Sequence, residues 1–324
     1  MPHIVVAGPL HPSGRALLDR ANGVSVTYIS ETSEASLAAE VAQADAVLLR
    51  TQPMTAPTIA KGGRLKIVSR HGVGYDAVDV NALSERGVAL AVCGDVNSTT
   101  VAEHAAMMIL ATCKRLLRAD ASVRGGAWEW RNKLEARDVR EQNLLLVGYG
   151  RIGRHTAAMM QAFGMNVRAH DPFLLKQGWP VDAVPSVRTL AEGLAWADVV
   201  SFSLPHTGKP LIGSDEFKQM RDGVVLINTA RGGLIDEAAL VSALQSGKVG
   251  AAGLDVFANE PMPNDHPLIK FDQVVLTPHI GGLTQDAAER MAVSSAENIL
   301  DFFEGKLDHT LIVNREEIDV ALQT

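Results

Sequence analysis

The sequence has little cysteine, few aromatic residues and no long apolar run. Its two cysteines, Cys93 and Cys113, show neither a C-x-x-C spacing nor a disulfide framework, so we expect two buried, reduced thiols and no bound metal. No apolar stretch approaches the length needed to cross a bilayer, and no charged segment precedes a long apolar one at the N-terminus. These absences predict a cytoplasmic protein that does not enter a membrane.

The chain also lacks any run of lysine or arginine, and its net charge is -7. Both observations argue against a nucleic acid or a membrane surface as a partner. Of the 324 residues, 47% are hydrophobic and 21% are charged, which is the composition of an ordinary globular protein. This length allows two domains of typical size.

A segment in the middle of the chain predicts a strand, a glycine-rich turn, a helix and a second strand. The apolar run 144–147 is followed by the pattern G-x-G-x-x-G at residues 148–153. In such a turn Gly148 allows the tight bend, Gly150 lets the backbone approach a pyrophosphate, and Gly153 lets the helix lie against the strand. The first N–H groups of the helix and its dipole then face the phosphates, so this turn predicts a dinucleotide site.

Asp171 follows the second strand, 167–170, about 20 residues after the glycines, where a carboxylate accepts hydrogen bonds from both ribose hydroxyls. Such a carboxylate would repel a 2′-phosphate, so the sequence favours NAD over NADP. Glycine turns also join strands to helices for structural reasons alone. The strand before the turn, the helix after it and the acid at this distance favour the cofactor interpretation.

Residues 1–99 alternate short apolar strands with amphipathic helices, which predicts a small α/β unit. One of its strands, 65–69, leads into the turn Gly72-Val73-Gly74. The N–H groups of this turn suit a carboxylate, and the same residues are equally typical of an ordinary tight turn. The residues alone leave both interpretations open.

From Asn97 onward the pattern predicts one long helix that continues to Leu117, with a capping box at 100–103. We interpret Met107, Met108 and His104 in this helix as packing residues. The next stretch, 124–142, carries two tryptophans and many charges, which indicates an excursion over the surface and a candidate subunit contact.

Polar residues collect after the remaining predicted strands. The segments that follow these strands are Pro205-His206-Thr207, Asn228-Thr229-Ala230-Arg231, Asp255 and Thr277-Pro278-His279. Open parallel sheets bind ligands outside the carboxyl ends of their strands, so we expect these residues to share one crevice with the Gly148 turn.

Three of the residues near these strand ends suit the reduction of a carbonyl beside a nicotinamide. Histidine is a common proton donor in catalysis, and His279 precedes Gly281-Gly282, which would let a ligand approach closely, so it is the candidate proton donor. Glu260 can accept a hydrogen bond from the imidazole and fix its tautomer. Arg231 can clamp the carboxylate of a 2-keto acid and polarise the keto oxygen.

The motifs that carry these residues closely resemble those of the D-isomer-specific 2-hydroxyacid dehydrogenase family, and most of all its 3-phosphoglycerate dehydrogenase and hydroxypyruvate reductase branch. The resemblance covers nearly the whole chain through segments 70–76, 101–104, 147–153, 228–237, 253–257, 259–261 and 277–282. It implies an α/β fold with two doubly wound parallel-sheet domains and an active site in the cleft between them. A Rossmann NAD-binding domain, 100–287, would be inserted into a flavodoxin-like substrate-binding (catalytic) domain formed by 1–99 and 288–324.

The resemblance also implies roles for individual residues. The catalytic triad would be Arg231, Glu260 and His279, and Arg50 with the backbone of Val73 and Gly74 would face the substrate. The residues expected to bind NAD are Gly148, Gly150, Arg151, Ile152, Gly153, Asp171, Leu204, Pro205, Thr229, Ala230, Asp255 and Gly281. Members of the family are usually homodimers joined through the cofactor domain, so we expect a homodimer.

The chain departs from the family pattern at three positions in and just before the strand that leads to the glycine turn, where it has Glu141, Gln142 and Leu145. It stops soon after the last predicted helix, which leaves no room for the regulatory domain of many phosphoglycerate dehydrogenases. Formate dehydrogenases of the family have glutamine at the position of Glu260, which argues against formate as the substrate.

The sequence thus predicts an NAD-dependent dehydrogenase that reversibly reduces a small 2-keto acid, of the phosphohydroxypyruvate type or the hydroxypyruvate and glyoxylate type. A phosphorylated or sulfonated substrate needs a second cationic patch. Arg50, Arg70 and His71 offer one, and each is equally typical of a solvated charge or an internal partner. The alternative function is an NADH-sensing binding protein of the corepressor type, without turnover.

Overall fold

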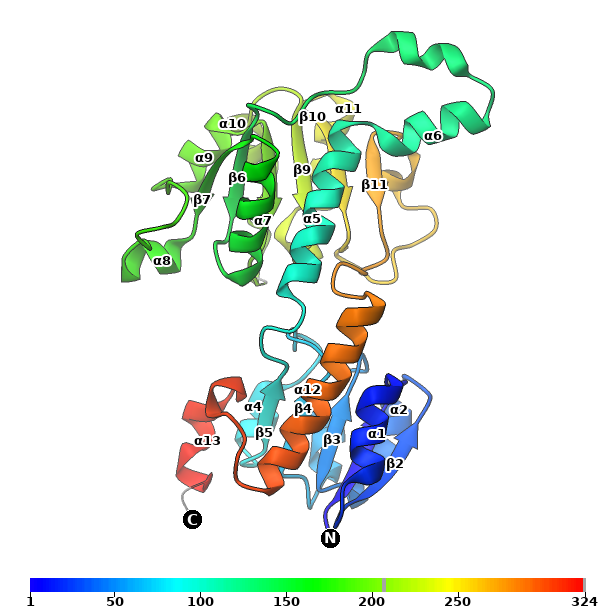
Figure 1. Ribbon diagram of the computed structural model, residues 1–324, viewed down its shortest axis with the longest axis vertical. Coiled ribbons are helices and arrows are strands. Elements are labelled where there is room, and N and C mark those ends of the chain that lie inside the picture. Colours follow the sequence, from blue (N-terminus) through cyan, green and yellow to red (C-terminus); the bar gives the residue numbers. More distant parts are fainter. Residues whose placement is uncertain (206–207, 323–324) are drawn as a thin grey trace. The chain divides into compact units, whose positions relative to one another are not determined.

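The computed structural model describes residues 1–205 and 208–322, so two of the polar residues expected after a strand, His206 and Thr207, lie outside the described residues. The chain divides into two compact units (Figure 1). Unit 1 comprises Met1–Asn97 and Thr284–Thr324, and unit 2 comprises Ser98–Leu283. The second unit is therefore an insertion in the first.

Unit 1 contains a five-stranded parallel sheet with the strand order β2-β1-β3-β4-β5. Its strands are β1 (His3–Ala7), β2 (Ser25–Ile29), β3 (Ala46–Leu49), β4 (Ile67–Arg70) and β5 (Ala89–Val92). Its helices are α1 (Pro12–Arg20), α2 (Glu34–Glu40), α3 (Ala56–Lys61), α4 (Val80–Ser84), α12 (Gln285–Phe303) and α13 (Arg315–Leu322). Side chains alternate along β1 between the two faces of the sheet. Ile4 and Val6 pack with α1 and α12 on one face, and Val5 and Ala7 pack with α2 and α3 on the other.

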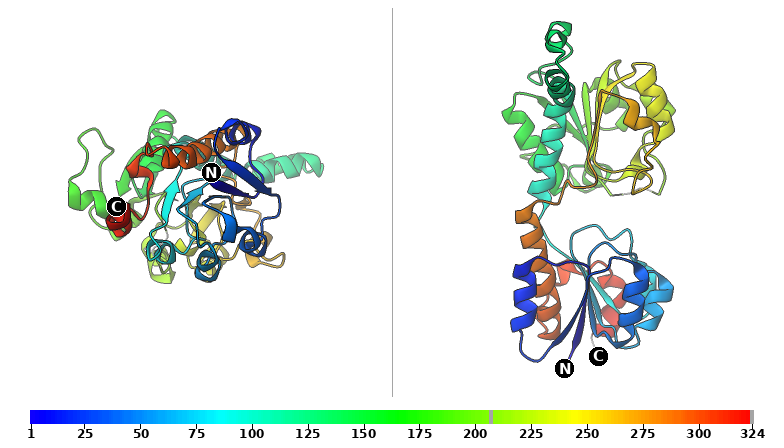
Figure 2. Two further views of the ribbon diagram at one scale, coloured as in Figure 1. Left: turned by 90° about the horizontal axis from the view of Figure 1, so that it is seen from below. Right: turned by 90° about the vertical axis from the view of Figure 1, so that its right-hand side faces the viewer.

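Unit 2 contains a six-stranded parallel sheet with the order β11-β10-β9-β8-β6-β7. Its strands are β6 (Asn143–Val147), β7 (Asn166–His170), β8 (Val199–Phe202), β9 (Val224–Asn228), β10 (Val249–Leu254) and β11 (Val274–Leu276). Its helices are α5 (Ser98–Cys113), α6 (Leu116–Arg124), α7 (Arg151–Ala162), α8 (Pro172–Gln177), α9 (Leu190–Trp196), α10 (Ser214–Gln219) and α11 (Glu237–Gln245). Figure 2 shows this sheet between two helix layers, with α5 and α7 on one side and α10 and α11 on the other. Both units are therefore doubly wound parallel sheets, as the sequence predicted.

The strands of unit 2 end in register. Val147, at the end of β6, is paired with His170 of β7 on one side and with Phe202 of β8 on the other. The same row continues to Asn228 of β9 and Leu254 of β10. Leu276 of β11 completes it. Because all six strands are parallel, the residues that follow them emerge at one edge of the sheet.

The strand order reverses between β6 and β8, because the chain runs from β6 outward to β7 and then returns to β8 on the other side of β6. Open α/β sheets bind ligands at such a switch point. The glycine-rich turn of residues 148–153 follows β6 directly, so it stands at this point of the sheet.

The prediction of one helix from Asn97 to Leu117 with a capping box at 100–103 is wrong. Helix α5 begins at Ser98 and ends at Cys113, and Arg115 has φ 52°, which breaks the α-helical path before α6 begins. Thr100 lies inside α5 and is buried, so the Thr-x-x-Glu pattern does not mark the helix start here. Among residues 1–205 and 208–322, no helix is both long and apolar enough to span a membrane.

Candidate active site

A histidine and a glutamate from two different loops meet at the carboxyl edge of the unit 2 sheet. Nδ1 of His279, which follows β11, lies 2.6 Å from Oε2 of Glu260, in the loop after β10. The other oxygen of Glu260 accepts a hydrogen bond from the backbone N–H of Phe257 at 3.0 Å. A carboxylate only accepts, so Nδ1 of His279 carries the proton that is shared with Glu260, and Nε2 points away from this pair. The imidazole is half exposed and can reach a ligand.

The turn that carries His279 is held by Asp255, the residue after β10. Asp255 is buried, and its carboxylate accepts hydrogen bonds from the backbone N–H groups of Ile280 and Gly281, both at 2.8 Å. Burial would raise the pKa of Asp255, but hydrogen bonds from His104, Thr277 and these two N–H groups outweigh it and lower the pKa below its ordinary value. Asp255 is therefore a carboxylate whose oxygens face inward, onto the turn.

Arg231 stands after β9, between the strands that lead to Asp255 and to Pro205. Asn228 fixes its backbone, because its side-chain amide donates to the carbonyl of Arg231 at 2.8 Å and its Oδ1 accepts from the N–H of Ala230 at 3.1 Å. The guanidinium donates to the carbonyl of Ala230 at 2.7 Å. A Cβ at Gly232 would lie 1.9 Å from the carbonyl carbon of Phe257, so only glycine lets the Arg231 loop pack on the loop that carries Glu260.

The glycines of the turn after β6 have three different surroundings. Gly148 has φ 94°, and a Cβ there would lie 2.4 Å from the carbonyl oxygen of Ser203. A Cβ at Gly153 would lie 2.5 Å from the carbonyl oxygen of Gly148. By contrast, a Cβ at Gly150 would meet no atom within 4 Å, and Gly150 caps α7 without any side-chain hydrogen bond. Two glycines therefore permit close packing inside the protein, and the third leaves open space at the N-terminus of α7.

Asp171, after β7, is held by three backbone N–H groups. Its Oδ2 accepts from Tyr149 in the glycine turn at 2.9 Å, and its Oδ1 accepts from Phe173 and Leu174 in the first turn of α8. Oδ1 thus accepts two hydrogen bonds, and Oδ2 accepts one and keeps a further lone pair. Its carboxylate is therefore fixed beside the glycine turn and can still accept from a ligand hydroxyl.

The other candidate cofactor residues occupy the same edge of the sheet. Thr229 is buried, and its Oγ1 has no hydrogen-bond partner within the described part of the chain, so this hydroxyl is available to a ligand. Leu204 and Pro205 follow β8, Arg151 and Ile152 begin α7, Ala230 follows Thr229, and Gly281 lies in the His279 turn. The open space at Gly150, the uncapped N-terminus of α7, the Asp171 carboxylate and the Thr229 hydroxyl together fit a dinucleotide.

The predicted substrate residues lie in unit 1, after its strands β3 and β4. Nη1 of Arg50 donates to the carbonyl of Pro9 at 2.5 Å, and burial lowers the pKa of Arg50. Val73 and Gly74 follow Gly72, which has φ 138°. Nη1 of Arg70 donates to the carbonyl of His71 at 2.8 Å. The Arg50 and Arg70 guanidinium groups are thus each oriented by a main-chain carbonyl of unit 1.

His71 does not add a third positive charge to this patch. It is buried, and burial together with the positive charges of Arg50 and Arg70 lowers its pKa to about 4. At neutral pH the ring is therefore uncharged. Its Nε2 is buried without a hydrogen-bond partner within residues 1–205 and 208–322.

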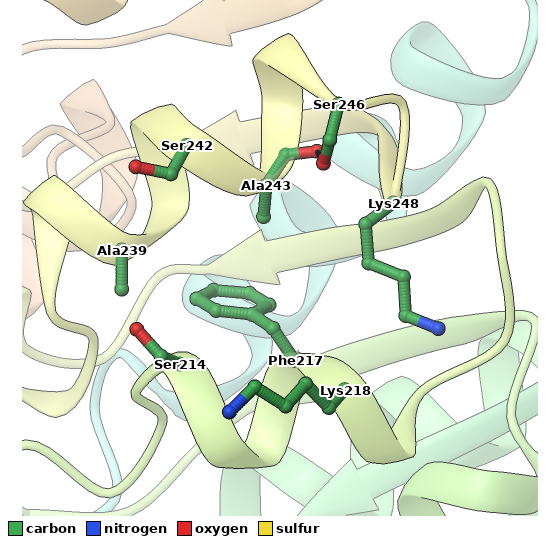
Figure 3. Close-up of a pocket in the computed structure, with 8 residues that line it drawn as sticks. All are labelled: Ser214, Phe217, Lys218, Ala239, Ser242, Ala243, Ser246 and Lys248. Carbon is green, nitrogen blue, oxygen red and sulfur yellow. Dashed lines mark hydrogen bonds between the residues drawn. The ribbon is translucent and has the colours of Figure 1, made fainter.

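Unit 2 also has a cavity of about 400 Å³ between α10 and α11, shown in Figure 3. It is lined by Ser214, Phe217, Lys218, Ala239, Ser242, Ala243, Ser246 and Lys248. Lys248 immediately precedes β10, at the amino end of that strand. The cavity includes none of the candidate residues and lies among the helices that cover the sheet. Within the described residues no group of three histidine, cysteine or acidic side chains could hold a metal.

Two residues that help to position this site had no role assigned from the sequence. Ser203 donates from its hydroxyl to the carbonyl of Gly148 at 2.8 Å, and Glu237 accepts from the backbone N–H of Ala258 at 2.8 Å. The only signal for Ser203 was its place directly after β8. Glu237 lies in the motif 228–237 but carried no assigned role.

The fold and the residues at the carboxyl edge of unit 2 are typical of a dinucleotide-binding α/β protein. Residues 106–281 match the family model described as "D-isomer specific 2-hydroxyacid dehydrogenase, NAD binding domain". The chain belongs to the D-isomer specific 2-hydroxyacid dehydrogenase family.

Individual relatives agree with this family. The chain is 38% identical over 307 residues to a D-3-phosphoglycerate dehydrogenase of Archaeoglobus fulgidus, which covers 93% of this chain and 57% of that protein. The chain thus spans little more than half the length of this curated relative. Among solved structures, it is similar to the TT0316 protein of Thermus thermophilus, with 33% identity, a TM-score of 0.86, and coverage of 94% of this chain and 98% of that one. A glyoxylate reductase from Paecilomyes thermophila has 29% identity and a TM-score of 0.85, with coverage of 97% and 99%.

Proposed function

We propose that the protein is an NAD-dependent dehydrogenase that reversibly reduces a small 2-keto acid to the corresponding D-2-hydroxy acid. The observation that carries this proposal is the 2.6 Å contact between His279 and Glu260 at the same sheet edge as the glycine turn. A carbonyl that accepts a hydride also needs a proton on its oxygen, and an imidazole paired with a carboxylate supplies it. In this proposal unit 2 binds the cofactor and unit 1 recognises the substrate.

The residues of unit 2 fit NAD, which when bound supplies or accepts the hydride. The open backbone at Gly150 and the N-terminus of α7 would hold the pyrophosphate. Asp171 would accept a hydrogen bond from a ribose hydroxyl and repel a 2′-phosphate. Thr229, Ala230, Leu204 and Pro205, which follow the neighbouring strands, would line the rest of the cofactor site.

His279 and Glu260 divide the proton chemistry between them. In reduction, protonated His279 donates from Nε2 to the substrate oxygen as the carbonyl carbon becomes a C–H centre, and in oxidation the neutral ring accepts this proton. In both directions of the reaction Nδ1 of His279 keeps its proton and donates it in a hydrogen bond to Glu260, and the carboxylate stabilises the charged ring. Asp255 holds the backbone on the far side of the turn, so the ring keeps one orientation.

Arg231 is the proposed anchor for the substrate carboxylate, because its planar guanidinium can form two parallel hydrogen bonds to it. Arg50 and the backbone of Val73 and Gly74 would face the other end of the substrate. Arg50 and Arg70 give unit 1 a positive edge, which suits a substrate with an anionic tail, such as a phosphorylated 2-keto acid. The D-3-phosphoglycerate dehydrogenases among the relatives support this choice.

The test is NADH oxidation with glyoxylate, hydroxypyruvate, phosphohydroxypyruvate, sulfopyruvate and pyruvate, comparing kcat/KM. We expect turnover with a 2-keto acid, highest for an acid with an anionic tail. Arg231→Gln should abolish most of this turnover while NADH binding stays intact. Tight NADH binding without turnover of any acid would contradict the enzyme and favour an NADH-sensing protein. A preference for glyoxylate or hydroxypyruvate would support the proposed dehydrogenase activity and reject a substrate with an anionic tail.

We further propose that the protein is a cytoplasmic homodimer joined through unit 2. After α5 the chain leaves the sheet and forms α6 and a 3-10 helix, Trp128–Lys133, which extend beyond the other helices of the unit (Figure 1). Neither helix has a buried residue, and their apolar side chains Leu116, Leu117, Val123 and Trp128 are exposed. We call these two helices the arm. If the arm of each copy packs against the other copy, its exposed apolar side chains are buried and the dimer is stabilised. The two free, buried cysteines agree with a reducing compartment.

The homodimer predicts that Leu117→Glu in the arm dissociates the protein into monomers. Val181→Glu is the control, because Val181 is also exposed but lies in the loop after α8. Light scattering coupled to size exclusion measures both masses. A monomeric wild type, or a Leu117→Glu variant with the mass of the wild type, would reject the arm as the interface.

A further inference from the structure

His104 on α5 contacts the turn that carries His279 from its buried side. Nε2 of His104 lies 3.1 Å from Oγ1 of Thr277 and 3.5 Å from Oδ1 of Asp255. A Cβ at Gly281 would lie 2.9 Å from Oδ2 of Asp255 and 3.4 Å from Cδ2 of the His104 ring. The ring of His104 therefore packs directly under the glycine that follows the proposed proton donor.

The order of donors and acceptors in this cluster follows from its geometry. The hydroxyl of Thr277 donates its only proton to Oδ1 of Asp255, at 2.5 Å. Thr277 can therefore only accept from His104, so Nε2 of His104 must carry a proton. The chain of hydrogen bonds runs from His104 to Thr277, and from Thr277 to Asp255.

Asp255 passes this constraint on to the backbone around His279. Its two oxygens accept from the N–H groups of Ile280 and Gly281, and its own carbonyl accepts from the N–H of His279 at 2.8 Å. His279 has φ 53°, a conformation that costs a residue with a side chain and persists only where its surroundings enforce it. The carboxylate of Asp255 is one of the groups that enforce it.

Helix α5 provides a fixed base for His104. Met108, four residues later and on the same face of the helix, is fully buried. A Cβ at Gly253 of β10 would lie 3.2 Å from the sulfur of Met108 and 3.1 Å from Oγ1 of Thr112. The glycine lets α5 lie close to β10, and this places His104 over the ends of β10 and β11.

We propose that His104 is a positioning residue for the reaction, which acts through Thr277 and Asp255 to hold the His279 turn. His104 touches no reacting atom in this role. The inference rests on the proposed function, in which His279 is the proton donor. The inference adds to the site a residue of α5 that lies 173 residues before Thr277 in the sequence.

The test compares two substitutions of His104. His104→Leu removes the donor and keeps an apolar side chain, whereas the amide of His104→Gln can still donate to Thr277. We expect His104→Leu to lower kcat by about 10- to 100-fold, the range typical of residues that orient a catalytic group, with NADH affinity within about threefold of wild type. His104→Gln should restore kcat to within about threefold of wild type.

Thr277→Val is an independent test, because it removes the hydroxyl group and keeps the shape of the side chain. It should reproduce the loss seen in His104→Leu, and the double variant should lose no more than either single one, since both break one chain of hydrogen bonds. Glu103→Gln, at an exposed position of the same helix, is the control and should match the wild type. Thermal unfolding of each variant shows whether it is folded.

Amide hydrogen exchange at Ile280 and Gly281 tests the inference without turnover. We expect these amides to be protected in the wild type and to exchange at least about tenfold faster in His104→Leu, while amides in the core of β9 keep their rates. Unchanged exchange, or an unchanged kcat in His104→Leu, would overturn the role of His104. An equal loss in His104→Gln would show that only packing matters. A wild type without turnover but with the expected change in exchange would reject the proposed function, and with it the role of His104 in a reaction, and would show only that His104 stabilises the turn.

Discussion

The carboxyl edges of the two parallel sheets differ in the charged side chains that they orient. After the strands of unit 2, the carboxylates of Asp171, Asp255 and Glu260 each accept hydrogen bonds from backbone N–H groups. At the carboxyl ends of the strands of unit 1, the guanidinium groups of Arg50 and Arg70 donate to backbone carbonyls. The main chain offers both donors and acceptors at strand ends, so it orients three carboxylates and the guanidinium of Arg231 in unit 2, and two guanidinium groups in unit 1.

In the proposed function, this difference corresponds to catalysis in unit 2 and substrate recognition in unit 1. In unit 2 a half-exposed imidazole is paired with a carboxylate, which supports a ring that gains and loses a proton. In unit 1 the imidazole of His71 is buried beside two positive charges, so it stays neutral. A histidine at the carboxyl edge of a sheet is therefore not by itself a catalytic signal. Its partners decide its role.

The largest expected effect is the loss of His279. His279→Ala removes the proposed proton donor and should lower kcat by about 10²- to 10⁴-fold, with NADH affinity unchanged. Glu260→Gln should lower kcat less, because the amide still reaches Nδ1 but does not stabilise a charged ring. Steady-state kinetics and NADH titration measure both. If His71→Leu reduced kcat as much as His279→Ala, the division between the two units would be wrong.

A smaller effect is expected at Asp171. Asp171→Asn keeps an oxygen for the N–H groups of α8 but removes the charge, so the preference of NADH over NADPH in kcat/KM should fall by about 10- to 100-fold. Asp171→Ser is the matched variant, since serine also caps helices. The ratio of the two cofactors in each variant is the measurement. An unchanged ratio in both would show that the carboxylate does not select the cofactor.

Most of the fold followed from local pattern, and the errors have local causes too. The glycine turn and the alternation of strands and helices predicted both sheets, because each signal lies within one short segment. The end of α5 escaped prediction, since residues 114–117 continue the helical pattern and the break at Arg115 is a matter of backbone conformation. The Thr-x-x-Glu pattern at 100–103 also shows that the sequence of a capping box can occur inside a helix, where its threonine is buried.

In the site, the sequence predicted the pairing of Glu260 and His279 from their chemistry, and the structure has that hydrogen bond. It could not predict the contact of His104 with Thr277, because this contact depends on how closely α5 packs against β10. Nor could it show that His71 is neutral, since only the fold buries the ring beside two arginines. The His104 contact and the charge of His71 both depend on packing between residues far apart in the sequence, and the residue types alone do not determine them.

The smallest of these effects is a pH dependence of stability that arises in unit 1. The folded pKa of His71, about 4, lies below the value of about 6.5 for a free imidazole, so the unfolded chain binds more protons between these values. The stabilisation is complete above pH 6.5 and is lost as the pH falls towards 4. Lowering the pH from 7 to 5 should therefore reduce the free energy of unfolding by about 2 kcal/mol through this residue alone.

His71→Leu removes the titration and should flatten the pH dependence by this amount, whatever its effect on stability at pH 7. His309→Leu is the control, because His309 lies in unit 1 outside the Arg50 and Arg70 patch and is not buried. Urea unfolding at pH 7, 6 and 5 gives the slopes. Parallel curves for the wild type and His71→Leu would mean that the ring is not held neutral. His71 would then be a third cation of unit 1. The two histidines would no longer differ in charge, and only the carboxylates of unit 2 would still distinguish the two units.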